Sequence, residues 1–558
     1  MKKTCLLLVA VYLIVINQTN AFRPIPPDSL EMAIDMIMSR HSGNDKPGAA
    51  IAILKDGELI FQKGYGMANL RSHQENGSKV VYNLASGSKQ FTAIALASLI
   101  QQKKLALTDS IGNFLPEFPA YGKAITVGNL LYHTSGIRDY MVLMWLTGQR
   151  FEDKFNNKNA LDIIFRQSTL NFKPGERCVY SNSNYILLAE IIERVTGRTL
   201  AANMHDLLKS INMKATSFST DNIDKKSTYA NSYFRSGKSY FPYKNNFTAY
   251  GDGGMLTTLE DLAKWDSKFY DEGSLQQYIL KRGTLNNGNI LNYGMGIMLG
   301  TYRNEVIQTH AGAFLGFRSE TLRFPEKRIT IICLGNAEEI NPESITKSIA
   351  DIYVFKDKKK VTLPDEKTQS DIVAIGPDYS EKIASIVGIY QVALNILIRI
   401  RYEDGVIIGQ IIGQPGQILY ADGSNSYKVG TTSDRVIFEN PMNGKYQQLT
   451  VMQKSNTTAQ RLPLLPAEYH SRYTGYYYST EQNATYYFYS KEGDLWFKIG
   501  KNAPLKVALL TSYNRIYFDY KNLEQATIDF HVDDSGNIKG FVLNSGRVKN
   551  IQFLKKKE

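Results

Sequence analysis

The chain carries, between residues 82 and 96, the segment Tyr82-Asn83-Leu84-Ala85-Ser86-Gly87-Ser88-Lys89-Gln90-Phe91-Thr92-Ala93-Ile94-Ala95-Leu96. Its apolar residues recur at helical spacing, so we expect an amphipathic helix whose start holds Ser86 and Lys89. Residues three apart share one face of a helix, which places the lysine ammonium within hydrogen-bond reach of the serine hydroxyl. An adjacent amine activates a serine hydroxyl, and backbone N–H groups at a helix start stabilise the oxyanion that forms next. The segment therefore predicts a nucleophile beside its own base.

A second segment has the same spacing. Ser344-Ile345-Thr346-Lys347 follows Asn341-Pro342-Glu343, which is a typical helix start, so it too is expected to open a helix. About two chance matches are expected in a chain of this length. Spacing alone does not choose between Ser86 and Ser344, so partner residues elsewhere must decide.

Length and composition indicate an ordinary globular protein. The chain has 558 residues, of which 43% are hydrophobic and 21% charged, enough for roughly two to four domains. The net charge of +12 favours anionic partners such as cell-envelope polymers. Because no basic run is interleaved with aromatic residues, no nucleic-acid partner is expected, and a solvated basic surface is the simpler interpretation.

The N-terminal residues 1–21 predict a signal peptide. Lys2 and Lys3 precede an apolar run from Cys5 to Ile16, and Thr19-Asn20-Ala21 fits a cleavage site. We therefore expect an exported protein, periplasmic or secreted. The apolar run is shorter than the roughly 20 residues that a spanning helix needs. No membrane span is expected after cleavage, and an uncleaved N-terminal anchor is the alternative.

The cysteine count excludes two classes of protein. Only Cys178 and Cys333 remain after residue 21, which rules out a disulfide scaffold and a multi-cysteine metal site. A single disulfide between these two cysteines stays open at this point. Cys333 lies in the apolar segment 329–334 and is most simply a small buried thiol.

Residues 22–355 mix helical and strand patterns and form the first predicted domain. Residues 49–61 are expected to form a hairpin around Asp56-Gly57. Segments 91–101 and 185–195 have helical periodicity, and Gly197 is the expected C-cap of the second. The β-branched run 329–334 predicts a core strand.

The pattern changes after Phe355. Residues 356–380 are polar and charged at their start and predict a linker. Short strands and turns follow, and Ser385-Ile386-Val387-Gly388-Ile389-Tyr390 is echoed 87 residues later by Arg472-Tyr473-Thr474-Gly475-Tyr476-Tyr477. We therefore expect two tandem β modules, at 381–460 and 461–558. Small barrels suit such meanders because closure removes exposed strand edges.

Two further motifs lie downstream of Ser86. Tyr180-Ser181-Asn182 stands between a Pro-Gly turn and a helical segment, and His310-Ala311-Gly312 precedes Ala313. Other matches to Tyr-x-Asn begin at Tyr229, Tyr243, Tyr302 and Tyr520, and His41-Ser42-Gly43 also fits the third pattern. Only their order and setting single these motifs out.

Taken in order, the Ser86, Tyr180 and His310 motifs resemble those of the serine hydrolases that include class C β-lactamases, DD-peptidases, D-aminopeptidases and related esterases. Two more landmarks look like segments of that family, namely Leu130-Leu131-Tyr132-His133-Thr134-Ser135-Gly136-Ile137 and Gly253-Gly254-Met255-Leu256-Thr257-Thr258-Leu259-Glu260-Asp261-Leu262. The resemblance covers roughly residues 25–355 and dismisses Ser344, which lies after the third motif. It implies a β-lactamase-like α/β (α+β) fold, with an antiparallel sheet flanked by helices and a helical subdomain.

The resemblance also implies roles for the matching residues. Ser86 would form an acyl-enzyme, with Lys89 preparing the hydroxyl and Tyr180 moving the protons. Because a tyrosine with an ordinary pKa of about 10 is a weak base at neutral pH, that role needs nearby cations, and Lys89 is the expected one. The amides of Ser86 and Ala313 would form the oxyanion hole beside Gly312, and Asn182 would bind the substrate amide and orient Lys89. No metal or organic cofactor is expected.

His310 departs from the β-lactamases and DD-peptidases, which usually place a lysine there to hold a substrate carboxylate. A histidine with a pKa of about 6.5 is mostly neutral at neutral pH, so carboxylate recognition is weakened. We therefore expect peptidase, D-aminopeptidase-like amidase or esterase activity on a small peptide, amide or ester. β-Lactamase or DD-carboxypeptidase activity is the runner-up, and a non-catalytic protein that binds envelope peptides is the alternative from another class.

Two expectations concern other parts of the chain. His133 is expected to stabilise a loop, and the aromatic run Thr485-Tyr486-Tyr487-Phe488-Tyr489 to form barrel core and wall. A catalytic domain followed by two lipocalin-like barrels looks like D-aminopeptidase, in which a barrel loop reaches the active site. The sequence does not say which loop would do so here.

Overall fold

The computed structural model describes residues 27–556, apart from 219–227, 356–378 and short gaps at 394–395, 404–405, 412–415, 431, 454, 463–465, 508, 513–514 and 521–522. The predicted signal peptide at 1–21 lies outside the described residues. So does the predicted linker, except for Tyr379 and Ser380, which begin helix α11.

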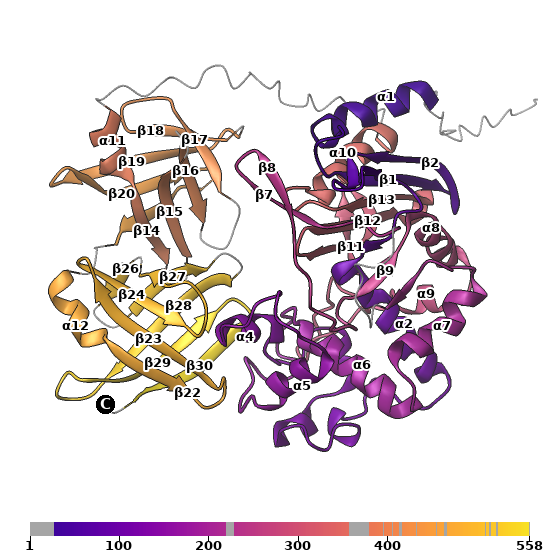
Figure 1. The fold of residues 1–558 in the computed structure, drawn as a ribbon, viewed down its shortest axis with the longest axis horizontal. Coiled ribbons are helices and arrows are strands. Elements are labelled where there is room, and N and C mark those ends of the chain that lie inside the picture. The colour runs from indigo at the N-terminus through magenta and orange to yellow at the C-terminus, as the bar shows by residue number, and fades with distance from the viewer. Residues whose placement is uncertain are drawn as a thin grey trace, which may run out of the picture.

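The first domain is built on a six-stranded antiparallel sheet with the order β10-β11-β12-β13-β1-β2 (Figure 1). The strands are β1 (Ala49–Lys55), β2 (Glu58–Tyr65), β10 (Met298–Tyr302), β11 (Glu305–Phe314), β12 (Phe317–Phe324) and β13 (Ile329–Gly335). The predicted hairpin at 49–61 is confirmed as β1 and β2. Asp56 and Gly57 both have positive φ, 56° and 83°, as a tight two-residue hairpin turn requires.

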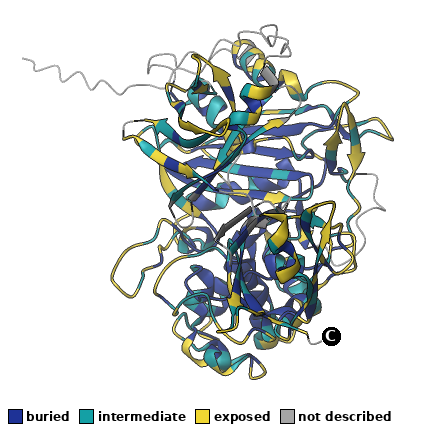
Figure 2. Ribbon diagram, turned by 90° about the vertical axis from the view of Figure 1, so that its left-hand side faces the viewer, coloured by how far each residue is buried: buried dark blue, intermediate teal, exposed yellow. Residues whose placement is uncertain are grey.

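Helices cover both faces of this sheet. α1 (Pro27–Met38) and α10 (Pro342–Tyr353) pack on one face, and α8 (Leu259–Ser267) packs on the other. All seven residues of β13 are buried, and the central strands stand out as dark blue in Figure 2. The core strand expected at 329–334 is therefore confirmed.

A helical subdomain stands beside the sheet. Its helices are α2 (Lys89–Gln101), α3 (Val127–Leu131), α4 (Tyr140–Leu146), α5 (Asn157–Phe165), α6 (Asn182–Thr196), α7 (Leu200–Ser210) and α9 (Leu275–Tyr278). Gly197 ends α6 with φ 67°, which confirms the predicted C-cap. The expectation of an amphipathic helix after Ser86 was wrong, because ten of the thirteen α2 residues are buried. α2 runs through the core, and a helix buried on nearly every side loses its polar face.

Short strands complete this domain. They pair as β3 (Met67–Asn69) with β4 (Gln74–Glu75), β7 (Tyr233–Ser236) with β8 (Ser239–Pro242), and β5 (Tyr82–Asn83) and β6 (Ser217–Phe218) on either side of β9 (Met255–Thr257). The last of these sheets lies beside the turn that holds Ser86, since Leu84 N donates to the Met255 carbonyl. The predicted fold class is thereby confirmed for this domain.

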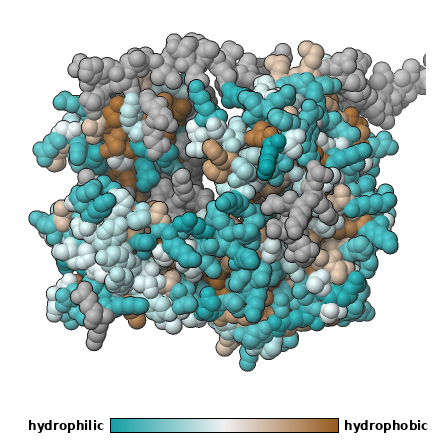
Figure 3. Space-filling view, in the orientation of Figure 1, coloured by the Kyte–Doolittle hydropathy of each residue, from teal (hydrophilic) through white to brown (hydrophobic). Residues whose placement is uncertain are grey.

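The first β module is a closed barrel preceded by α11 (Tyr379–Ile386). Its strands are β14 (Gly388–Ala393), β15 (Ile396–Glu403), β16 (Val406–Ile411), β17 (Gln417–Ala421), β18 (Ser426–Val429), β19 (Arg435–Met442), β20 (Lys445–Met452) and β21 (Thr457–Arg461). β14 pairs with β21 and closes the ring. The face seen in Figure 3 is largely hydrophilic, and apolar side chains gather over this barrel.

The second β module is a half-barrel. After α12 (His470–Tyr473), one sheet has the order β25-β24-β23-β22-β30-β29-β28-β27-β26. The strands are β22 (Gly475–Ser479), β23 (Ala484–Lys491), β24 (Asp494–Ile499), β25 (Leu505–Lys506), β26 (Leu509–Ser512), β27 (Arg515–Tyr520), β28 (Leu523–Val532), β29 (Ile538–Ser545) and β30 (Val548–Lys555). Tyr486 and Phe488 fill its core, whereas Tyr487 points outward.

The two modules repeat one device at the predicted offset. The Tyr390 hydroxyl donates to the Ile386 carbonyl at 2.8 Å, and the Tyr477 hydroxyl donates to the Tyr473 carbonyl at 3.0 Å. Both side chains are fully buried. Among the described residues, every helix is too short or too polar to cross a lipid bilayer.

Candidate active site

Ser86 lies on a tight turn in front of α2. This 3-10 turn, η2, spans Ala85–Ser88, so Lys89 is the first residue of α2 and Ser86 stands just outside it. Ala85 has φ 48° and donates its N–H to Asn83 Oδ1 at 2.8 Å. Ser88 Oγ donates to the Ala85 carbonyl at 2.6 Å and accepts from Met255 N at 3.0 Å. These bonds hold the left-handed backbone that presents the half-buried Ser86 hydroxyl.

Lys89 is fully buried and aims its ammonium at three acceptors. Nζ lies 2.6 Å from the Asp252 carbonyl, 2.9 Å from Asn182 Oδ1 and 3.4 Å from Ser86 Oγ. An ammonium has three N–H donors, so each of them has one acceptor. The contact between Ser86 and Lys89 that the spacing predicts is present. The Asp252 carbonyl belongs to the loop that opens the predicted Gly253 landmark.

Tyr180 lies between Lys89 and His133. Its ring centroid is 4.8 Å from Lys89 Nζ and 4.3 Å from the His133 ring. The Tyr180 hydroxyl is buried and makes no hydrogen bond with any described residue. Since buried polar atoms nearly always have a partner, this oxygen is free to receive one from a reacting molecule.

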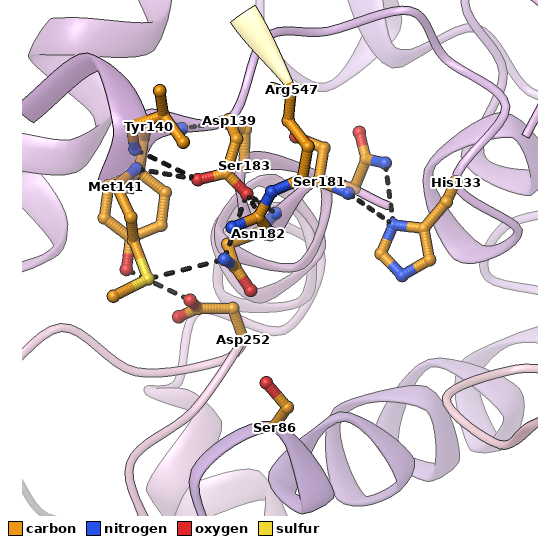
Figure 4. A network of polar contacts seen from close by, with 12 residues as sticks. Ser86, His133, Asp139, Tyr140, Met141, Ser181, Asn182, Ser183, Asp252 and Arg547 are labelled. Carbon is orange, nitrogen blue, oxygen red and sulfur yellow. Dashed lines mark hydrogen bonds and ion pairs between the residues drawn. The ribbon is translucent and has the colours of Figure 1, made fainter. Parts of the chain in front are cut away.

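Asn182 begins α6 and links Lys89 to Asp139. Its Nδ2 donates to Asp139 Oδ2 at 3.0 Å, and its backbone N donates to the same oxygen at 2.8 Å. Because the amide nitrogen faces a carboxylate, the amide oxygen must face the other way, toward Lys89. Figure 4 shows Asn182 beside Asp139. Together with the contact from Asn182 Oδ1 to Lys89 Nζ, this geometry supports the expectation that Asn182 orients the lysine.

His310 is buried at the end of a chain of hydrogen bonds. Its Nδ1 lies 2.7 Å from the Ala311 carbonyl, which only accepts, so Nδ1 carries the proton. Nε2 then accepts from the Tyr293 hydroxyl at 3.3 Å, and that hydroxyl is also 3.3 Å from His133 Nε2. His133 Nδ1 accepts from Ser181 N at 3.2 Å. When both histidines are neutral, each donor in this series of hydrogen bonds has an acceptor.

The pKa shifts agree with this protonation. Burial, reinforced by the nearby Lys89 charge, lowers the pKa of His310 to about 4. Burial likewise holds the pKa of His133 well below its usual range. Burial raises the pKa of Asp252 to about 6, although the Lys89 charge opposes the shift. The expected neutral His310 is therefore neutral over a wider pH range than its residue type alone predicts.

Gly312 and Ala313 lie on β11 beside the Ser86 turn. β10 pairs with β11 only along 305–309, so the β10-side edge of residues 310–314 is left to face η2. A Cβ on Gly312 would lie 2.3 Å from the Leu84 carbonyl oxygen and 2.4 Å from Ser319 Oγ. Only glycine permits this approach, which brings β11 against Leu84 and Ala85 of the Ser86 turn. The oxyanion hole expected from the amides of Ser86 and Ala313 stays a prediction.

Residues 34–353 match the Beta-lactamase family. The match spans more than half of the chain and contains the Ser86, Tyr180 and His310 motifs in order. The chain belongs to the Beta-lactamase family. The predicted membership of a family of β-lactamase-like serine hydrolases is therefore confirmed.

Curated relatives of this Beta-lactamase family member include two D-aminopeptidases. That of Brucella anthropi is 29% identical over 317 residues, covering 56% of this chain and 59% of the relative. That of Cereibacter sphaeroides is 28% identical over 318 residues, with 56% and 60% covered. The chain thus spans about three fifths of the length of the curated relatives it matches.

Solved structures share the fold at low identity. A penicillin-binding protein homologue from Pyrococcus abyssi aligns with a TM-score of 0.53 and 20% identity, covering 78% of this chain and 100% of its own. A D-amino acid amidase from Ochrobactrum anthropi gives 0.50 and 20%, covering 59% and 100%. These likenesses confirm the β-lactamase-like fold.

Sequence reasoning missed three groups at this Beta-lactamase family site. Asp139 precedes α4 as its N-cap, a signal that helix-start rules could have found. Tyr293 joins the two histidines from a loop that has no motif. Arg547, on the turn between β29 and β30, pairs with Asp139 at 3.0 Å from 408 residues away. Through that contact, the β29–β30 turn of the second module reaches Asp139, which binds Asn182.

The competing motif and the two cysteines lie elsewhere. Ser344 is on α10, as its predicted helix start indicates, and Lys347 there pairs with Glu343. Cys178 is exposed and Cys333 buried, and the structure has both as free thiols. Among the described residues, no cluster of three or more His, Cys, Asp or Glu side chains is arranged to hold a metal ion.

Proposed function

We propose that the chain is a serine hydrolase that cleaves small peptide amides or esters through an acyl-enzyme on Ser86. The observation that carries this is the Lys89 ammonium, which is bonded to Ser86, Asn182 and the Asp252 carbonyl at once. A buried cation held in this way polarises the serine hydroxyl and stabilises its alkoxide.

The proton of Ser86 goes to Tyr180. All three Lys89 donors already have acceptors, whereas the Tyr180 oxygen has no partner among the described residues. Ser86 Oγ attacks the substrate carbonyl carbon as its proton passes to the Tyr180 oxygen, which reacts as the phenolate. The amides of Ser86 and Ala313 stabilise the resulting oxyanion. Tyr180 then protonates the leaving group as the bond between the carbonyl carbon and that group breaks.

Water completes the cycle. Tyr180 removes a proton from a water molecule, which attacks the ester carbonyl of the acyl-enzyme. The second tetrahedral intermediate collapses, the bond to Ser86 Oγ breaks, and the proton returns from Tyr180 to Ser86. The carboxylic acid product then dissociates, and Ser86 and Tyr180 are back in their starting state.

The neutral His310 favours a substrate without a carboxylate at this position. With a pKa of about 4, it offers no cation at neutral pH to hold the carboxylate of a penicillin or a D-Ala-D-Ala peptide. The D-aminopeptidase relatives support a D-amino-acid amide or short peptide as substrate. We therefore rank β-lactamase or DD-carboxypeptidase activity second.

Export is the second part of the proposal. The basic and apolar pattern of residues 1–21 supports a secreted or periplasmic enzyme that meets cell-envelope peptides. Mass spectrometry of the mature protein from the natural host tests this. Cleavage after Ala21 supports export, and an intact N-terminus in the cytoplasm contradicts it.

A substrate panel tests the reaction. D-amino-acid amides, D-Ala-D-Ala peptides, a chromogenic cephalosporin and short esters are given to wild type and Ser86→Ala, and a fluorophosphonate is used to label the nucleophile. We expect turnover of amides or esters, phosphonylation at Ser86 and loss of both in Ser86→Ala.

Two outcomes would overturn parts of this proposal. An unlabelled Ser86 with no turnover, combined with tight peptide binding, assigns the fold to a non-catalytic binding protein. Strong hydrolysis of the cephalosporin by wild type reverses the ranking of substrates. His310→Lys is expected to raise turnover of carboxylate-bearing substrates relative to amides, because it restores a cation at that position.

A further inference from the structure

One arginine of the half-barrel reaches into the catalytic domain. Arg547 stands on the turn between β29 and β30, and its Nη1 lies 3.0 Å from Asp139 Oδ2 (Figure 4). Its Cζ lies 5.8 Å from the centroid of the Tyr180 ring. The Arg547 carbonyl accepts from Asn171 Nδ2 at 2.8 Å. The side chain and the backbone carbonyl of Arg547 therefore both hold this turn against the catalytic domain.

The partner of Arg547 is a carboxylate with no access to water. Asp139 is 0% exposed, and its Oδ1 accepts from Met141 N at 3.0 Å at the start of α4. Within the described part of the chain, Arg547 is the cation that forms an ion pair with it. Breaking a buried ion pair by removing one partner is strongly unfavourable, so the docked half-barrel supplies the cation that compensates Asp139.

Asp139 in turn sets the direction of the Asn182 side-chain amide. Its Oδ2 receives Arg547 Nη1 and also both nitrogens of Asn182. The Asn182 amide oxygen consequently points at Lys89 Nζ, 2.9 Å away, and the lysine reaches Ser86. If Asp139 moved, the Asn182 amide would lose the acceptor that sets its direction.

We propose that Arg547 is a positioning residue that couples docking of the half-barrel to the readiness of Ser86. It acts through Asp139, Asn182 and Lys89, and the inference rests on the proposed function of Ser86. The catalytic domain then carries the reacting groups, while the second β module supplies the charge that holds them in their working arrangement.

The test compares Arg547→Met, which removes the charge at similar length, with Arg547→Lys, which keeps it. Steady-state kinetics on the best substrate and the rate of Ser86 phosphonylation are measured in the full chain. Misplacing a catalytic group by about 1 Å costs about 100-fold in rate. We expect Arg547→Met to lower kcat and the labelling rate by that order with KM within about threefold, and Arg547→Lys to recover at least about a tenth of the wild-type rate.

A double variant separates positioning from simple destabilisation. Arg547→Met leaves Asp139 as an unpaired buried charge, whereas Arg547→Met with Asp139→Asn leaves none. If the loss in Arg547→Met comes from the uncompensated Asp139 carboxylate, the double variant should label Ser86 faster than Arg547→Met alone. A purely structural role predicts that the two losses add.

Arg150 gives a matched control at the same interface. Its Nε donates to Asn502 Oδ1 at 3.0 Å and its Nη2 to the Lys501 carbonyl at 3.1 Å, so it joins the half-barrel to the catalytic domain away from Asp139. Arg150→Met is expected to keep the wild-type kcat. Wild-type rates in Arg547→Met, or equal losses in Arg150→Met, would overturn the inference while leaving the role of Ser86 intact. A wild type that neither labels nor turns over contradicts both proposals.

Discussion

The two β modules start alike and end differently. Each follows a short helix and buries a tyrosine, Tyr390 or Tyr477, whose hydroxyl binds the carbonyl four residues earlier. The first module then closes into a barrel with a core of its own, whereas the second stays a half-barrel. The core of the half-barrel is continuous with that of the helical subdomain. A sheet that closes satisfies its own edges, and one that stays open keeps surface for another domain.

The contacts of the half-barrel show what its open form provides. The Tyr486 hydroxyl donates to the Leu146 carbonyl at 3.1 Å, at the end of α4, beside which Figure 1 places the half-barrel. Arg138, fully buried, pairs with Glu481 and donates from Nε to the Lys549 carbonyl at 2.9 Å. Each of these links crosses from the catalytic domain to the second module.

The largest expected effect comes from removing Arg138, which joins the second β module to the catalytic domain and, among the described residues, has no contact of this kind with the first module. Arg138→Ala leaves Glu481 unpaired and nearly buried, since its side chain is 12% exposed, and should lower the free energy of unfolding by about 3–5 kcal/mol. Urea unfolding followed by tryptophan fluorescence measures it, because Trp145, Trp265 and Trp496 lie outside the first barrel.

Arg461→Ala is the matched control for Arg138→Ala. Arg461 donates to the Ser385 and Tyr446 carbonyls at 2.8 and 3.0 Å within the first module. Its loss should speed hydrogen exchange in 388–461 and leave tryptophan unfolding and turnover unchanged. A shared unfolding transition in both variants would contradict the separation of the two modules.

Acidification should act on the catalytic domain and spare the first barrel. His133 and His310 have lowered pKa values, so the unfolded chain binds their protons first and stability falls as pH drops below about 6.5. Asp252, whose pKa is raised to about 6, binds its proton first in the folded chain and opposes this. Glu320 on β12, whose pKa burial raises to about 7, opposes it as well. Each buried histidine therefore contributes about 1.4 kcal/mol per pH unit between pH 6 and 4.5, against two opposing carboxyl groups.

Residues 388–461 contain no histidine, so the first barrel is an internal reference for this effect. Hydrogen exchange at pH 6 and pH 4.5, corrected for the intrinsic rate, compares it with the catalytic domain. His310→Gln removes one histidine contribution, so the catalytic domain should lose less stability between pH 6 and pH 4.5 than it does in wild type. An equal slope in the barrel would show that the buried histidines are not its cause.

The smallest expected effect comes from the repeated tyrosines. Tyr477→Phe removes one buried hydrogen bond, worth about 1 kcal/mol. Tyr390→Phe removes the matching bond and also the one that the Tyr390 oxygen accepts from Arg461 Nη1 at 3.2 Å. Local protection from hydrogen exchange should fall in both modules, and somewhat more around Tyr390. Only Tyr477→Phe should extend its effect into α4, because only that module shares a core with the helical subdomain. Equal spread from both sites would argue against the contrast drawn above.

The sequence predicted features that depend on neighbours in the chain. The Asp56-Gly57 hairpin, the strand at 329–334 and the tandem offset of 87 residues all arise from local periodicity or turn chemistry. The order of the Ser86, Tyr180 and His310 motifs likewise located the residues that the fold brings together. The buried character of α2 was missed because burial on a second side depends on which segments pack there.

What the sequence could not show lies in contacts across long separations. Asp139 and Arg547 have no common motif, and each alone resembles an ordinary cap or surface cation. Closure of the first module and openness of the second depend on the pairing of their last strands, as β14 pairs with β21. No local pattern in the chain encodes that pairing.

Asp139 and Arg547 are 408 positions apart in the sequence, so the ribosome adds them at well-separated times. Domains form as the chain emerges, N-terminal parts first, so Ser86 and Lys89 are made long before the arginine that neutralises Asp139. During that interval the cation that pairs with Asp139 in the full chain has not yet been made. If Arg547 acts as we propose, a chain truncated before the β29–β30 turn would have a folded catalytic domain with an unready Ser86.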